Sequence, residues 1–336
     1  MNLKPYNVDL IVSSFLCYQS CALVVFNVNT TLGNRAEPSS SVMESFYVGY
    51  FLTSVVIFGS VGNILVIMSI CKQNFYKKAY YYVVLHLSIC DLISLLLPSS
   101  HSYKSLTSEY WTVSTALCQL TILPRIFFTA GVLFMVVMSL LRYRAVCYPL
   151  RPAVSRWKLH LASSTVYVFG LLFRIPLLFI FDLVTPDKCF DPWPSTTWII
   201  TYTVALFAIQ YFIPVVILGL VYWKICSELV KQSKIIKSMN ASIADEEKER
   251  WFFQRLAHNR NTRTFVVSFA IFVCFLVAGS PHQIAFTLDV LGVLDVNGRV
   301  YYEWFRVMYF FGVSAVNPLI YGALDKKLSS IFKRCR

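Results

Sequence analysis

Charged residues are scarce in this chain. Of its 336 residues only 14% are charged and 57% are hydrophobic, whereas soluble domains carry roughly 25% charged residues. So few charges cannot cover the surface of a water-soluble protein of this size, and that class is excluded. Apolar runs of about 20 residues, the length that crosses a bilayer as a helix, recur along the whole chain. The sequence therefore predicts an integral membrane protein.

Signatures of catalysis and transport are missing as well. The chain has no HExxH, GxSxG or P-loop motif, and its five histidines are scattered without metal-ligand spacing. It contains no repeat with a period of 20 to 50 residues, and no inverted repeat of the kind found in many transporters. These absences argue against an enzyme and against a transporter, and they favour one helical domain.

Seven apolar segments are predicted to cross the membrane. They must be helices, because lipid leaves unpaired backbone groups unsatisfied and the ten-residue alternating strands of a barrel are absent. The expected fold class is an all-α membrane protein, a seven-transmembrane helix bundle. The bundle occupies residues 46–323, between an N-terminal tail (1–45) and a cytoplasmic amphipathic segment (324–336). The expected spans are Phe46–Ile70, Tyr80–His101, Ala116–Cys147, Leu159–Phe181, Thr197–Leu229, Thr264–Leu291 and Tyr301–Ala323.

Lysine and arginine set the orientation. One set of loops carries 22 of the 30 basic residues, in the ranges 72–78, 142–158, 224–263 and 326–336. Loops rich in Lys and Arg stay on the cytoplasmic side, so the N-terminus is expected outside and the C-terminus inside. The net charge of +13 then reflects topology and contact with anionic membrane lipid, and it does not indicate a nucleic-acid partner.

The predicted outer face has three further features. Residues 1–28 fit either a signal peptide, with a charged start and an apolar middle, or an extracellular tail. Asn29 begins a glycosylation sequon on this face. Cys118 and Cys189 lie beside helix ends in an oxidising compartment, where they are placed to form a disulfide.

Polar residues within the spans indicate function, because burying them in lipid is unfavourable. Asn63, Asp91 and Asn317 lie at similar depth in three different spans, with Ser314 one turn before Asn317. One interpretation is a polar core in which water or a cation such as Na⁺ neutralises Asp91, and this is the only cofactor expected. The other interpretation is that they are unrelated buried residues bonded to the backbone.

The motifs of the chain occur in a diagnostic order. They are Gly62-Asn63, "LSICDL" around Asp91, Trp111 followed by Cys118, "RYRAVCYPL" from Arg142 to Leu150, Pro176, Cys189, Pro214 with Tyr222, Phe275 with Pro281, and "NPLIY" from Asn317 to Tyr321. Over residues 45–336 the chain resembles the rhodopsin-like (class A) G-protein-coupled receptors, with the closing segment "GALDKKLSSIFKRCR" similar to the family's short amphipathic eighth helix.

This resemblance implies a mechanism. An extracellular agonist contracts the outer pocket, the polar core rearranges, and the sixth helix swings out to admit a heterotrimeric G protein. Arg142 with Tyr143, Tyr222 and Tyr321 would then form the inner switch. The location implied is the plasma membrane, with several spans and an extracellular N-terminus.

The chain departs from the family at the inner end. Leu141 stands where the family has the acid that restrains the neighbouring arginine, and Asn261 stands where the sixth helix often supplies a second acid. Two hypotheses follow: Arg142 is held weakly and basal activity is raised, or the receptor signals poorly. A decoy or scavenger receptor that binds ligand without G-protein coupling is the corresponding alternative function.

A second departure lies in the sixth span. Gly279 occupies the position of the tryptophan in the family's Cys-Trp-x-Pro pattern, which removes the indole at the pocket floor. The space is expected to be filled by His282, Gln283, Phe275 or a ligand group.

The outer halves of the spans suggest the ligand. Pro124 and Arg125 stand at the level where amine receptors of the family have an aspartate, and Phe311 replaces the lysine that binds retinal in opsins. These residues argue against an amine ligand and against light sensing. Arg125 and Arg306 could bind an acidic ligand group, since arginine binds carboxylates bidentately, or they could pair internally with Asp289, Glu303 or Asp182. Arg174 is expected nearer to lipid.

The proposed ligand-binding set is Arg125, Arg306, Gln283, His282 and Glu303. Many outer residues are acidic or aromatic, and aromatic anchors dominate peptide interfaces, so a neuropeptide is the preferred ligand. A small acidic metabolite or lipid is the alternative, and the aromatic residues also fit the belt of any membrane protein.

Overall fold

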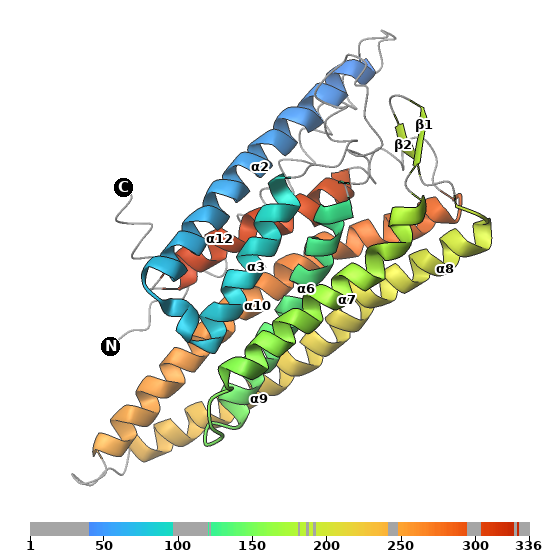
Figure 1. Cartoon of the computed structure of the whole chain (residues 1–336). Helices are drawn as coiled ribbons and strands as arrows, with labels where there is room; N and C mark the ends of the chain where they lie inside the picture. Colours follow the sequence, from blue (N-terminus) through green and yellow to red (C-terminus); the bar gives the residue numbers. More distant parts are fainter. Residues whose placement is uncertain are drawn as a thin grey trace.

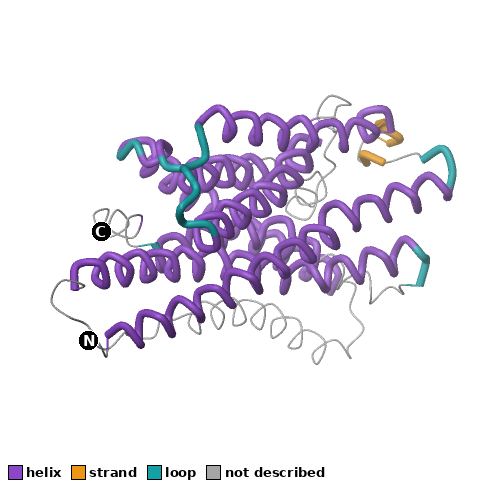
Figure 2. The backbone as a smooth tube through the Cα atoms, turned by 90° about the horizontal axis from the view of Figure 1, so that it is seen from below, coloured by secondary structure: helices purple, strands orange, loops and turns teal. Residues whose placement is uncertain are grey.

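A computed structural model describes most of the chain. The backbone is described over residues 40–96, 122–180, 182–185, 188–190, 193–240, 248–293 and 304–325, with residues 120 and 328. The helices form a bundle in which they run along one common direction, with two short strands at one end (Figures 1 and 2). We call the strand end the outer end and the opposite end the inner end, following the orientation that the basic loops predict.

The described residues contain apolar helices in the places of all seven predicted spans, which confirms the predicted helical bundle. Six helices in the described residues are long and apolar enough to span a bilayer, and a shorter apolar helix, Ala79–Leu95, stands in the second place. The elements are α2 (Ser40–Lys72), η1 (Phe75–Lys77), α3 (Ala79–Leu96), α6 (Ile122–Cys147), α7 (Arg156–Ile180), α8 (Thr196–Phe207), η2 (Ala208–Phe212), α9 (Ile213–Asn240), α10 (Lys248–Val290), η4 (Met308–Gly312) and α12 (Val313–Leu324).

The fifth and sixth helices are longer than a membrane is thick. The α8, η2 and α9 elements are consecutive from Thr196 to Asn240, and α10 extends over 43 residues. Both helices project beyond the bundle at the inner end (Figure 1). Their extensions contain mixed charges and few helix breakers, so the helical pattern continues into the aqueous phase.

The only strands in the described residues form a hairpin, an exception to the expected all-α fold. Strand β1 (Asp182–Thr185) pairs antiparallel with β2 (Lys188–Phe190), with Leu183 opposite Cys189. The hairpin follows α7 at the outer end (Figure 1). The sequence predicts only a loop between the fourth and fifth spans, because strands of three or four residues are too short to show a period.

Helix α6 lies in the middle of the bundle, where it contacts α3, α7, α9 and α10. The main cluster of buried apolar residues joins these helices, and Phe134, Met138 and Phe275 within it are fully buried. Large apolar side chains also cover the outside, since Ile57 and Phe179 are 60% and 85% exposed. An apolar exterior of this kind suits lipid and not water.

Two π-helical segments interrupt the α-helices beside the core. One is η2, within the fifth span, and the other is η4, within the Trp304–Leu324 helix. Single-turn π segments are rare and occur frequently at functional sites, because they rotate the following side chains. Here they direct Gln210 and Tyr309 into the bundle, and both side chains are buried.

Candidate functional site

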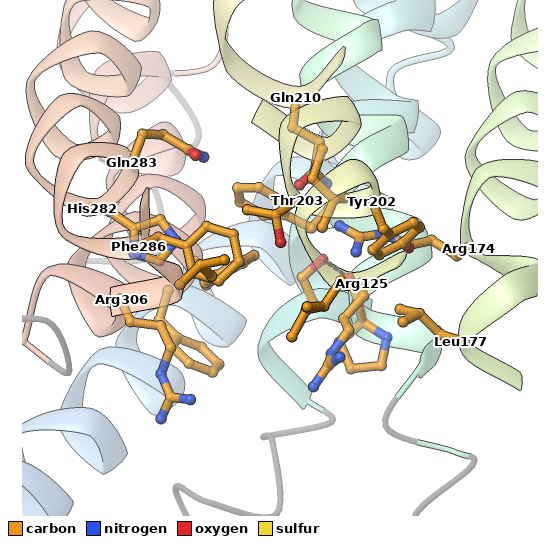
Figure 3. A pocket seen from close by; sticks show the side chains of 18 of the residues that line it. Arg125, Arg174, Leu177, Tyr202, Thr203, Gln210, His282, Gln283, Phe286 and Arg306 are labelled. Carbon is orange, nitrogen blue, oxygen red and sulfur yellow. Dashed lines mark hydrogen bonds between the residues drawn. The ribbon is translucent and has the colours of Figure 1, made fainter. Parts of the chain in front are cut away.

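A cavity of about 280 Å³ opens among the outer halves of the helices. Its walls come from α3, α6, α7, the fifth span, α10 and the Trp304–Leu324 helix (Figure 3). The lining residues are Ser94, Pro124, Arg125, Phe128, Arg174, Leu177, Trp193, Ile199, Tyr202, Thr203, Leu206, Gln210, His282, Gln283, Phe286, Val290, Arg306, Phe310 and Phe311. Apolar walls with a few convergent polar groups are typical of ligand sites.

Three arginines meet in this cavity from three helices. Arg125 comes from α6, Arg174 from α7 and Arg306 from the Trp304–Leu324 helix (Figure 3). The expected position of Arg174 near lipid is wrong, because the side chain is only 3% exposed and faces the cavity. Among the described lining residues there is no aspartate or glutamate, so the cavity wall is strongly basic.

A buried polar network surrounds Thr129. The Thr129 hydroxyl accepts hydrogen bonds from Gln210 Nε2 at 2.6 Å and from Arg174 Nε at 3.3 Å. It donates to the backbone oxygen of Arg125 at 2.9 Å. All of the bonding capacity of this hydroxyl is thereby used. The three helices α6, α7 and the fifth span are joined at this point, and Thr129 and Gln210 carried no signal in the sequence beyond being polar within a span.

His282 and Gln283 lie on α10 at the side of the cavity (Figure 3). Both are buried. The His282 ring stacks on Tyr309, with 4.9 Å between ring centroids. The two residues therefore belong to the cavity wall, together with Arg125 and Arg306 from the same predicted set.

Two tyrosine side chains fill the space beside Gly279, the position at which the family has a tryptophan. A Cβ atom on Gly279 would lie 2.8 Å from Tyr211 Cε2 and 3.0 Å from Tyr309 Cε2. Both rings therefore pack directly against the α10 backbone, and the Tyr211 hydroxyl hydrogen-bonds Ser280. The expectation that His282, Gln283 or Phe275 fills this space is wrong. Tyr211 and Tyr309 lie within η2 and η4, two π-helical segments that no sequence pattern showed.

Below the cavity, the polar residues of three spans come together. Asn317 Nδ2 donates to Asp91 Oδ2 at 2.7 Å, and the Ser314 side chain hydrogen-bonds the same carboxyl group. Asn63 Nδ2 donates to the backbone oxygens of Gly59 and Ser314, each at 3.0 Å. The side-chain oxygens of Asn63 and Asn317 are buried without a hydrogen-bond donor in the described part of the chain. Two unused acceptors beside a carboxyl group form a site that suits a cation or water.

At the inner end, Arg142 lies against an aromatic ring. Its guanidinium carbon is 3.7 Å from the centroid of the Tyr80 ring, a cation–π contact between α6 and α3. Its Nε is buried and has no hydrogen-bond partner within the residues described. Leu141, beside it, packs against the main apolar cluster. Arg142 thus contacts an aromatic face, while the apolar Leu141 stands at the position of the family's carboxylate.

The other predicted switch residues surround this contact. Tyr222 donates through its hydroxyl to the Ser268 backbone oxygen at 3.0 Å. Tyr321 is fully buried, and its hydroxyl has no partner among the described residues. Tyr143 packs against the apolar cluster that contains Tyr222, and Asn261 is partly buried on α10.

Two further inner contacts were not predicted. Tyr81 donates through its hydroxyl to the Asp325 carboxylate at 3.0 Å, which joins α3 to the end of α12. Arg263 Nε donates to the Leu324 backbone oxygen at 2.8 Å, which holds the inner part of α10 against α12. Both links involve loop-side charges that look like an ordinary solvated face in the sequence, so only the fold reveals them.

Several predicted features lie outside the described residues. They are Glu303, Cys118, Asn29, residues 1–39 of the N-terminal tail and most of the closing amphipathic segment. Only the backbone of Cys189 is described, in β2. The proposed disulfide and glycosylation therefore stay predictions.

Known proteins support the interpretation of this arrangement. The chain is 29% identical to the rat (Rattus norvegicus) somatostatin receptor type 5 over 323 residues, which covers 92% of this chain and 82% of that receptor. It is 22% identical to the neuropeptide F receptor of Drosophila melanogaster over 334 residues, covering 92% of this chain and 66% of that protein. The chain thus spans about two thirds of the length of the Drosophila relative.

A solved structure supports the fold. The structure of squid rhodopsin superposes with a TM-score of 0.74, covering 89% of this chain and 86% of that one at 18% identity. At that identity the likeness concerns the fold alone. The family model described as "7 transmembrane receptor (rhodopsin family)" matches residues 62–321, most of the chain. This chain therefore belongs to the rhodopsin-like (class A) G-protein-coupled receptors, a family of multi-pass membrane receptors and not of enzymes.

Proposed function

We propose that the chain is a plasma-membrane receptor, with its N-terminus outside, that binds an extracellular peptide in the outer cavity and activates a heterotrimeric G protein. The observation that carries this proposal is that one helix, α6, bears both ends of the machinery. Arg125 lines the cavity and Arg142 lies at the inner end. Seventeen residues separate them, about 25 Å at the helical rise per residue.

The signal passes through the packed middle of the bundle. Tyr309 packs against the cavity-lining rings of Phe128, His282 and Phe310. The Asp91–Asn317 pair belongs to the polar core further inward. An agonist that binds one arrangement of these groups more tightly than another shifts the population between two states. The sixth helix then moves outward, which requires release of the Arg263 link to α12.

A neuropeptide is the preferred ligand class. Two of the relatives, the neuropeptide F receptor of Drosophila and the neuropeptide S receptor of the mouse, are named for such ligands. The aromatic residues Trp193, Tyr202 and Phe286 in the cavity wall supply anchors of the kind that dominate peptide interfaces. A receptor for a small acidic metabolite or lipid is the second candidate, because the cavity wall is basic.

We also propose Na⁺ as the ion of the polar core. The fit rests on the Asp91 carboxyl group and on the free side-chain oxygens of Asn63 and Asn317. Hard cations of this kind take oxygen ligands. When bound, Na⁺ would neutralise Asp91 and stabilise the resting arrangement.

The test is a G-protein recruitment assay in cells that express the full chain. A peptide library and a library of acidic metabolites and lipids are screened against a panel of Gα subunits. We expect a peptide to raise recruitment, and we expect Arg142→Ala to abolish the response. Arg144→Ala is the matched control, since Arg144 is two residues further along α6 and bonds the backbone oxygen of Pro152 at 3.0 Å.

Two other results would replace this proposal. Responses to acidic metabolites or lipids alone would favour the second ligand class. Peptide uptake into cells without recruitment of any Gα subunit would favour the decoy or scavenger function.

A further inference from the structure

Arg174 is a buried cation without a carboxylate. Its side chain is 3% exposed, and its bonds go to the hydroxyl groups of Thr129 and Tyr202. No aspartate or glutamate contacts this guanidinium in the part of the chain that the structure describes. Arg174 differs in this respect from a structural arginine, which is buried together with its counter-ion.

Neutral hydroxyls do not balance the charge of Arg174. Burying an ionised group without an opposite charge is unfavourable by several kcal/mol, and hydrogen bonds from neutral partners compensate only part of that. The Thr129 hydroxyl is already used by Gln210 and by the backbone of Arg125. An anionic group that enters the cavity would supply the missing negative charge.

The guanidinium faces the cavity. In Figure 3 it extends from α7 toward Gln210 and Tyr202, while the Arg125 and Arg306 side chains point away from Gln210 and Gln283. All three line the same 280 Å³ space. A group that enters from outside therefore passes two arginines before it reaches the third, and an anion is attracted along this path.

We infer that Arg174 is the anchor for a carboxylate of the ligand, bound at the inner limit of the cavity. The inference rests on the proposed receptor function and names the chemical group that its ligand must carry. The planar fork of an arginine matches the two oxygens of a carboxylate, and the Gln210 amide beside it adds a neutral donor. Arg125 and Arg306 are guides at the entrance and are not the anchor.

The carboxylate has two possible sources. One is a peptide, through its C-terminus or an acidic side chain, and the other is a small carboxylic acid. Both present the same group to Arg174. A ligand whose C-terminus is amidated and which has no acidic side chain should not bind in this mode.

The first experiment uses benzoate and benzamide as probes. The two have nearly the same shape and differ in charge, so they isolate the carboxylate. The full-length receptor is purified in nanodiscs, and its melting temperature is recorded against increasing concentration of each probe. A bound probe stabilises the folded state by mass action. Benzoate should raise the melting temperature, and benzamide should not.

Variants locate the effect. Arg174→Gln should weaken benzoate binding by about 10- to 100-fold, the loss expected for hydrogen bonds to a charged group. Arg174→Lys should restore part of it, because lysine keeps the charge but lacks the fork. The control is Arg156→Gln, at the exposed inner start of α7, which should leave benzoate binding unchanged.

Three results would overturn the inference: equal shifts with both probes, no shift with benzoate, or full benzoate binding by Arg174→Gln. If Arg174→Gln does not fold, Arg174→Lys decides: benzoate binding as tight as that of the native chain would overturn the inference, because lysine lacks the fork. Paired peptides with free-acid and amidated C-termini then identify the source of the carboxylate. Benzoate binding without any G-protein recruitment would contradict the proposed function and leave the anion site in place. Recruitment by amidated peptides without benzoate binding would support the proposed function and contradict the anion site.

Discussion

Two arginines at opposite ends of the bundle, Arg174 buried and Arg142 half-buried, are stabilised in different ways. At the outer end Arg174 bonds neutral side chains and faces a cavity that contains two more arginines. At the inner end the half-buried Arg142 has its guanidinium carbon 3.7 Å from the centre of the Tyr80 ring. Neither has a carboxylate partner among the described residues.

The difference indicates two functions for the same side chain. The Tyr80 ring compensates Arg142 within the protein, so that contact can hold a resting state without an acid at position 141. The charge of Arg174 is left for an external partner, so that residue can report whether a ligand is present. Each variant below changes one end of the helix bundle, and the unchanged arginine at the other end is the internal reference.

The largest effect is expected beneath the outer cavity. Gly279→Ala places a Cβ atom 2.8 and 3.0 Å from two tyrosine rings, and overpacking of this kind destabilises by about 1–3 kcal/mol. Thermal unfolding of the purified receptor measures it. Gly219→Ala is the matched control, because nothing lies within 4 Å of its added Cβ, and it should be neutral or slightly stabilising. Equal effects of the two changes would show that the tyrosines do not pack on Gly279.

The second-largest effect is expected for the contact between the Tyr80 ring and Arg142 at the inner end. Tyr80→Leu removes a cation–π interaction worth about 0.5–2 kcal/mol, so the active population should rise by about 2- to 30-fold. Basal nucleotide exchange on a reconstituted G protein measures it. Tyr80→Phe keeps the ring and should behave as the native chain. Unchanged basal exchange in Tyr80→Leu would mean that the ring does not restrain Arg142.

A smaller change is expected for the link between α10 and α12. Arg263→Gln removes the donor to the Leu324 backbone oxygen, a loss of about 0.5–1.5 kcal/mol. Basal exchange should rise by less than in Tyr80→Leu. Arg260→Gln, on the exposed side of the same helix, is the control. A lower basal rate in Arg263→Gln would contradict the role of this link.

The smallest effect is expected at Leu141. Leu141→Asp supplies the acid that the family normally has, and a pair near the membrane surface contributes below about 1 kcal/mol. Basal second-messenger output should fall slightly if Arg142 in the native chain is held weakly. Equal output in the two chains would remove the hypothesis of raised basal activity.

Sequence alone predicted the helical bundle and the depth of its polar core. Long apolar runs give helices in lipid, and counting along them placed Asn63, Asp91 and Asn317 at one level, where the structure brings them together. Those predictions depend on helical spacing alone, which a sequence displays directly.

Contacts between helices were not predictable in the same way. The approach of Tyr80 to Arg142 and the inward turn of Tyr211 and Tyr309 depend on helix rotation. The π segments η2 and η4 set that rotation in two helices, and they have no sequence signature. The prediction that Arg174 lies near lipid was wrong for the same reason. Its depth in the span follows from counting along the helix, but the direction of its side chain does not.

The different roles of Arg174 and Arg142 are tested most directly by comparing variants of both residues in one assay. Concentration–response curves for G-protein recruitment are recorded with a peptide agonist found by the screen, together with ligand-binding curves, for the native chain, Arg174→Gln and Arg142→Gln. We predict that Arg174→Gln shifts the curve to higher agonist concentration with the same maximum. Arg142→Gln should lower the maximum while ligand binding is retained. Loss of binding in Arg142→Gln, or an unshifted curve in Arg174→Gln, would contradict the account.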